Sequence, residues 1–118
     1  MNTPWQHIDV EARGDLRCVR LRQKRIEEEN IDALGDELLA VASEEGCARM
    51  ALSLGPQPPD CLYSIFLGKL IAVQRRLREM GRTLLLCEAG PEVLAIFGAC
   101  QLLEHFTFVA DFDAAANV

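Results

Sequence analysis

The chain has 118 residues, a length that fits one domain with one hydrophobic core. Half of the residues are hydrophobic and a quarter are charged, a globular composition that excludes an intrinsically disordered chain. Twelve basic residues against eighteen acidic ones give a formal net charge of −6, which disfavours binding to the phosphate backbone of a nucleic acid.

The apolar runs are only a few residues long, as at residues 70–73, so the sequence predicts no membrane-spanning segment. The first seven residues lack the basic-then-apolar pattern of a signal peptide, and we therefore expect a cytoplasmic protein. Although the net charge is negative, five basic residues lie close together in sequence on one predicted helix and at its end. This group is either a solvated helix face or a docking patch for an acidic partner. Its members are Lys69, Arg75, Arg76, Arg78 and Arg82.

The cysteines are odd in number and widely spaced. They are Cys18, Cys47, Cys61, Cys87 and Cys100. A zinc site needs closely spaced ligand pairs, but the chain has no Cys-x-x-Cys pair, and His7 and His105 lie near its opposite ends. We therefore predict no metal site and no cofactor. Cys18 and Cys87 lie in apolar, strand-like runs, where a free cysteine behaves as a small hydrophobe, so we expect buried, reduced thiols.

The amino-terminal third predicts a hairpin followed by a helix. Residues 8–12 and 16–23 read as two strands, and Gly14 in their short connection supplies the positive φ that a tight turn requires. The charged connection that follows contains Ile26, which we expect in a short edge strand. Asn30 is a good N-cap for a helix whose apolar positions recur at helical spacing up to Val41.

The rest of the chain alternates strands and helices. Residues 49–54 and 83–87 are short apolar runs that fit buried strands, and the proline-rich residues 55–60 form a loop. A helix marked by Leu67, Leu70, Ile71, Gln74 and Leu77 lies between the two strands. A second helix begins at Pro91, a strand covers residues 106–109, and Asp111 caps a terminal helical turn.

Strands that alternate with helices imply parallel neighbours joined by right-handed crossovers. The predicted fold class is therefore α/β, in a single domain that spans residues 1–118. We expect a small mixed sheet of four to five strands, with about four helices packed mainly on one face.

This element order, with particular residues at particular places, resembles the STAS domain family, whose founding members are bacterial anti-sigma factor antagonists. The segment that carries the resemblance is residues 62–70, LYSIFLGKL, which follows a strand and opens a helix that ends at Gly81. Family members have a motif of the type Asp-Ser-Ser-Gly-Leu-Gly-x-Leu there. The later strand, the Pro-led helix, a Leu-x-x-x-Phe segment and an acidic-Ala end also match, so the likeness covers nearly the whole chain.

The resemblance implies a phosphorylation site at Ser64, because the first serine of that motif is phosphorylated by an anti-sigma kinase in the antagonists. A phosphate at the start of a helix meets the positive end of the helix dipole, whereas a partner packed on the same spot would have to desolvate a dianion. Phosphorylation would thus switch a binding surface off. The alternative is that Ser64 is an ordinary N-cap.

The residues around Ser64 also have two interpretations. If the family geometry carries over, the loop displays an apolar cluster suited to protein binding, and we predict a partner-binding surface at Tyr63, Ile65, Phe66, Leu67, Gly68 and Lys69. The alternative is that Ile65 and Phe66 cover the edge of the sheet.

Catalysis is not expected. The chain has no Gly-x-Ser-x-Gly elbow, no P-loop and no Gly-x-Gly-x-x-Gly turn. Its acidic clusters are consecutive in sequence, as at residues 27–29, so their side chains splay apart rather than converge as an acid/base pair.

The sequence thus predicts a non-catalytic regulatory domain that binds a protein partner, an anti-sigma factor or a regulatory kinase, in bacterial signalling. Two alternatives stay open. A phosphorylation-independent STAS adaptor or scaffold is favoured by the replacement of motif positions by Tyr63, Ile65 and Phe66. A small-ligand sensor would hold a nucleotide or lipid near residues 55–63. The oligomeric state is also open, because the edges of a small sheet can pair.

Overall fold

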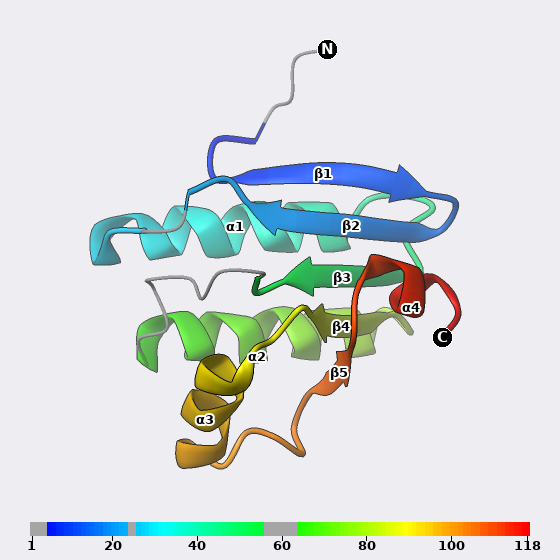
Figure 1. Ribbon diagram of the computed structural model, residues 1–118. Helices are drawn as coiled ribbons and strands as arrows, with labels where there is room; N and C mark the ends of the chain where they lie inside the picture. Colours follow the sequence, from blue (N-terminus) through cyan, green and yellow to red (C-terminus); the bar gives the residue numbers. More distant parts are fainter. Residues whose placement is uncertain (1–4, 24–25, 56–63) are drawn as a thin grey trace.

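A computed structural model describes residues 5–23, 26–55 and 64–118 (Figure 1). Its single mixed sheet has the strand order β1-β2-β3-β4-β5. The strands are β1 (Ile8–Arg13), β2 (Leu16–Leu21), β3 (Arg49–Ser53), β4 (Thr83–Cys87) and β5 (Thr107–Val109). The predicted hairpin is confirmed: β1 and β2 are antiparallel, with Arg13 opposite Leu16, and Gly14 between them has a φ of +61°. The other three pairings are parallel, as the alternating order predicts.

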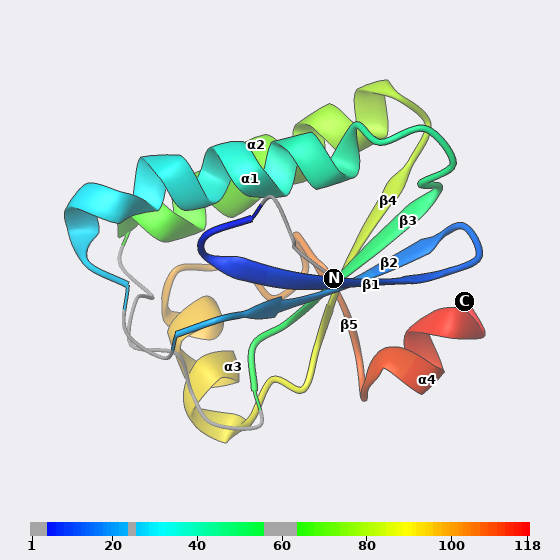
Figure 2. The same cartoon turned by 90° about the horizontal axis from the view of Figure 1, so that it is seen from above.

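The helices cover the two faces of the sheet unequally (Figure 2). They are α1 (Ile31–Ala42), α2 (Ser64–Glu79), α3 (Pro91–Ala99) and α4 (Phe112–Ala116), with a short 3-10 turn η1 (Glu28–Asn30) before α1. Two long helices, α1 and α2, lie side by side on one face, whereas the short α4 lies on the other. The predicted α/β fold, with helices mainly on one face, is confirmed. No helix among the described residues is long and apolar enough to cross a membrane.

The main hydrophobic core lies between the sheet and helices α1, α2 and α3. Each helix contributes one buried stripe, because apolar residues three or four positions apart share a helix face. Phe97 of α3 packs edge-to-face against Phe106 and Phe108, with ring centroids 5.6 and 5.4 Å away. A smaller core lies under α4, where Phe112 and Ala115 cover the opposite face of the sheet.

Three local expectations are wrong. Ile26 belongs to no strand; it is buried in the main core just before η1. Asn30 makes no capping hydrogen bond, because η1 runs directly into α1 and leaves Asn30 with helical backbone angles. Cys100 is exposed at the end of α3, although Cys18, Cys47 and Cys87 are buried as expected. The Asp111 cap is confirmed: its carboxylate accepts a hydrogen bond from the backbone N–H of Ala114 at 2.8 Å.

Candidate partner-binding site

The candidate site lies at the carboxyl ends of the parallel strands, where α2 and α3 begin (Figure 1). In open α/β sheets this edge is where ligands and partners reach residues from several elements at once. Ser64 is the first residue of α2, in agreement with the predicted start of a helix. Tyr63 and most of the predicted loop lie outside the described residues.

Of the predicted binding residues in the first turns of α2, some are exposed and others are buried. Ile65 is 43% exposed and Gly68 is also exposed, whereas Phe66 and Leu67 are 0% and 4% exposed. The expected display of Phe66 and Leu67 on the surface is therefore wrong. Both side chains belong to the main core, because they share a helix face with Leu70. Phe66 covers the sheet, as the alternative interpretation held, but Ile65 does not.

Lys69 is half-buried and forms an ion pair with Asp32 of α1, with its Nζ 2.6 Å from the carboxylate. This hydrogen bond raises the pKa of Lys69, so the ammonium stays charged. The pair links α2 to α1 beside the exposed part of the site.

Three of the five residues in the predicted basic patch on and after α2 are paired with other groups of the chain. Arg76 lies 3.5 Å from Glu79, and Arg82 donates hydrogen bonds to the carbonyl oxygens of Ala42 and Glu44 after the end of α1. Arg75 and Arg78 are exposed, and their side chains form no hydrogen bond or ion pair with the other described residues. Two cations, rather than five, are thus left for an acidic partner.

A polar cluster that the sequence analysis missed holds the strand ends next to this site. The Ser53 hydroxyl at the end of β3 lies 2.6 Å from the carboxylate of Glu88, which follows β4. Arg20, near the end of β2, pairs with the same carboxylate at 2.8 Å. The backbone N–H of Gly55 donates to the Ser53 hydroxyl oxygen at 3.2 Å. The available signal was that Ser53, Glu88 and Arg20 are polar and lie near or just beyond the end of a strand in a parallel part of the sheet.

Glu88 and Gly55 approach each other closely within this cluster. Glu88 has a φ of +57°, in the left-handed region that non-glycine residues rarely adopt. A Cβ atom at Gly55 would lie only 2.2 Å from the Glu88 carbonyl oxygen, so only glycine fits there. The cluster therefore fixes the point at which the chain leaves β3 for the segment that leads to Ser64.

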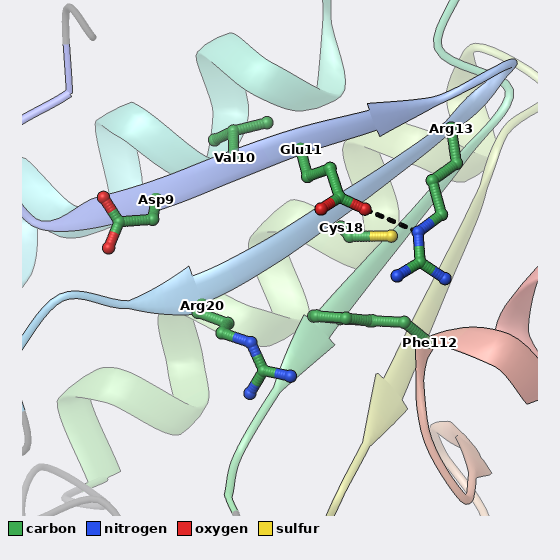
Figure 3. Close-up of a pocket in the computed structure, with 7 residues that line it drawn as sticks. All are labelled: Asp9, Val10, Glu11, Arg13, Cys18, Arg20 and Phe112. Carbon is green, nitrogen blue, oxygen red and sulfur yellow. Dashed lines mark hydrogen bonds and ion pairs between the residues drawn. The ribbon is translucent and has the colours of Figure 1, made fainter.

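A surface pocket of about 230 Å³ lies on the face of the sheet that carries α4 (Figure 3). The Phe112 ring forms part of its wall, with the Arg20 guanidinium 4.7 Å and the Arg13 guanidinium 5.9 Å from the ring centroid. Four charged side chains line the pocket, two basic and two acidic, so their formal charges cancel. The lining residues are Asp9, Val10, Glu11, Arg13, Cys18, Arg20 and Phe112.

The buried thiols are not poised to react. Burial, with a smaller contribution from Glu88, raises the pKa of Cys87 to about 12, and burial also raises the pKa of Cys18 and Cys47. These thiols therefore stay protonated at neutral pH. Within residues 5–23, 26–55 and 64–118, no group of three His, Cys, Asp or Glu side chains is placed to hold a metal ion.

No protein-family model matches the chain, and no curated protein matches it. Solved structures do match. An anti-sigma-factor antagonist (STAS) domain protein from Planctomyces limnophilus is 15% identical, with a TM-score of 0.74 over 87% of this chain and 89% of that one. A putative anti-sigma factor antagonist from Thermotoga maritima is 16% identical, with a TM-score of 0.72 over 93% of this chain and 92% of that one.

A third match is the Bacillus cell fate determinant SpoIIAA in its phosphorylated form. It is 11% identical, with a TM-score of 0.67 over 93% of this chain and 97% of that one. In each of these three comparisons the superposition covers most of both chains. The agreement therefore includes the whole arrangement of sheet and helices and not one motif alone. The chain therefore has the fold of STAS domains, the fold of anti-sigma factor antagonists.

Proposed function

We propose that this protein is a non-catalytic, cytoplasmic regulatory domain of the anti-sigma factor antagonist type. It binds a protein partner, an anti-sigma factor or a regulatory kinase in bacterial signalling, and it does not bind nucleic acid or membranes. Phosphorylation of Ser64 switches this binding off. The observation that carries the proposal is the position of Ser64 as the first residue of α2, next to exposed Ile65, in a fold shared with a protein solved in a phosphorylated form.

The electrostatics of α2 favour a phosphate at this position. The helix is 16 residues long, and its first turn contains no acidic residue. A phosphate of about −1.5 to −2 charges would therefore meet the positive end of the helix dipole without like-charge repulsion from that turn. The fold would tolerate the modification, whereas a partner packed on Ile65 and Gly68 would have to desolvate it.

The phosphorylation test compares the chain with two serine variants. Phosphosite mass spectrometry on protein from its native cells is expected to find phosphate on Ser64 and to lose it in the Ser64→Ala variant. Ser43→Ala, at an exposed serine after α1, is the matched control and should leave the modification unchanged. An unmodified Ser64 peptide under several growth and stress conditions would contradict the switch.

The binding test uses two residues of equal exposure. Ile65 and Leu103 are each 43% exposed, but Leu103 lies in the connection between α3 and β5 and not in α2. Co-purification from native cells should recover the partner with wild-type protein and with Leu103→Arg, and should lose it with Ile65→Arg. Equal recovery with both variants would place the partner elsewhere on the surface.

A further inference from the structure

The strand β1 forms one edge of the sheet and leaves part of its backbone unpaired. The N–H of Arg22 donates to the carbonyl oxygen of His7 at 2.9 Å, so His7 and Arg22 form a hydrogen-bonded pair of the hairpin. In an antiparallel ladder such pairs alternate with non-bonded pairs. The backbone groups of Ile8, Val10 and Ala12 therefore point away from β2.

Two of these three residues are available for a new strand. The carbonyl oxygen of Ile8 already accepts a hydrogen bond from the Arg22 guanidinium at 3.3 Å. Within the described part of the chain, no interaction occupies the outward backbone groups of Val10 and Ala12. The opposite edge strand, β5, has only three residues, so β1 with its six is the longer template.

The side chains of β1 carry a charge pattern on one face. Asp9, Glu11 and Arg13 lie on the side of the strand that faces the pocket, and Val10 points to the other side (Figure 3). Arg13 contacts Glu11 at 2.6 Å and Asp113 at 2.9 Å, so its guanidinium is held near the sheet surface. A strand added at this edge would place its own side chains directly opposite these charges.

We propose that two copies of this chain associate through their β1 strands, antiparallel, with Val10 of each copy opposite Ala12 of the other. The free backbone groups of Val10 and Ala12 then form four hydrogen bonds between the copies. Glu11 lies on the two-fold axis, and Asp9 of each copy faces Arg13 of the other. The continuous sheet has ten strands, twice the five of one chain.

The charges select this register over its neighbours. With Val10 opposite Val10, Asp9 would face Glu11 of the other copy twice, and the occupied Ile8 carbonyl would be needed. With Ala12 opposite Ala12, only residues 11–13 of β1 would overlap. In the proposed register five residues overlap and both Asp9–Arg13 pairs are attractive. Among the directly opposed residues, the one repulsive pair is Glu11 against Glu11, so the association is weak and depends on concentration.

Charge-reversal variants test the pairing directly. Sedimentation velocity at low salt should show wild-type protein forming dimers as its concentration rises from micromolar to about millimolar. Asp9→Arg and Arg13→Asp should each weaken dimerisation by about tenfold, because two attractive pairs become repulsive. An equimolar mixture of the two variants should form a heterodimer at least as tight as the wild-type dimer, because both pairs are attractive again. Glu11→Gln should tighten the dimer.

The matched controls are charge reversals of the same kind at other positions. Glu104→Arg and Arg75→Asp lie at exposed positions away from β1 and should leave dimerisation unchanged, singly or mixed. Val10→Pro removes an outward N–H that the monomer does not use, so it should leave a folded monomer. The proposal is wrong if the wild type stays monomeric throughout, if Val10→Pro dimerises normally, or if the mixture is no tighter than its components.

Discussion

The Ser53 hydroxyl and the Glu88 carboxylate lie 2.6 Å apart and join the carboxyl ends of two neighbouring parallel strands. This hydrogen bond spans 35 positions of sequence and lies beside the close backbone approach of Gly55 to Glu88. Together they fix the backbone at Gly55, just beyond the end of β3. Glu88, which follows β4, therefore holds the backbone at the end of β3 in place.

Gly55→Ala should destabilise the fold by about 1–3 kcal/mol, because its methyl group would overlap the Glu88 carbonyl oxygen. The matched control is Gly90→Ala, since an added Cβ at Gly90 meets no atom within 4 Å. The control should change the free energy of unfolding by less than about 0.5 kcal/mol. Urea unfolding of both variants provides the comparison, and equal losses would mean that the two backbones do not approach as described.

Gly68→Ala should stabilise the fold by about 0.5–1 kcal/mol, because Gly68 lies inside α2 with open space around its Cα atom. Gly35→Ala in α1 is the control. Its Cβ would lie 3.0 Å from the Lys69 side chain, so steric crowding should offset the gain in helix propensity. The midpoint temperature of thermal unfolding should be higher for Gly68→Ala than for the wild type and for Gly35→Ala. If Gly35→Ala is the more stable variant, the packing of α1 against α2 differs from that described.

The pKa of Asp15 should be below its ordinary value of 3.8, chiefly because the Arg49 guanidinium lies 2.8 Å from its carboxylate. A carboxylate with a lowered folded-state pKa stabilises the protein above its unfolded pKa, and this stabilisation is lost as the pH falls. Arg49→Met should therefore return the Asp15 pKa towards 3.8. The free energy of unfolding should then fall less steeply as the pH is lowered. Titration of the Asp15 carboxyl by NMR measures its pKa, with Arg76→Met as a control that should leave it unchanged.

The fold should lose stability between about pH 9 and pH 12 because of Cys87. Burial raises the folded-state pKa of this thiol from 9.0 to about 12, so the unfolded chain releases the proton first as the pH rises. The contribution of this one group is at most about 1.4 kcal/mol per pH unit. Cys87→Ala should reduce the steepness of the alkaline loss in urea unfolding, whereas Cys100→Ala, at an exposed thiol, should not.

Features of the fold with a local cause could be predicted from the sequence. The hairpin depends on a two-residue turn with glycine, and the Asp111 cap depends on a carboxylate three residues before Ala114. The parallel strands follow from the alternation of apolar runs with helices. The start of a helix at Ser64 came instead from the resemblance of residues 62–70 to the motif that opens this helix in STAS domains.

Features that depend on distant partners could not be predicted. Whether Ile65 or Phe66 is buried depends on the side of α2 that meets the sheet, which one chain segment does not reveal. The contact of Ser53 with Glu88 and Arg20 needs the registers of three strands. The number of basic residues free on α2 depends on acceptors in α1, since Arg82 reaches carbonyl oxygens 38 and 40 positions earlier.

The short helix α4 is attached to the sheet by arginine side chains as well as by its buried Phe112 and Ala115. Arg49 donates to the carbonyl oxygens of Ala115 and Val118 at 2.9 and 3.0 Å, and Arg13 pairs with Asp113 at 2.9 Å. Exposed ionic contacts weaken as dissolved salt screens them, whereas apolar burial under α1 and α2 does not. Concentrated salt should therefore weaken the Arg13–Asp113 part of the attachment of α4, whereas the burial of Phe112 and Ala115 should persist.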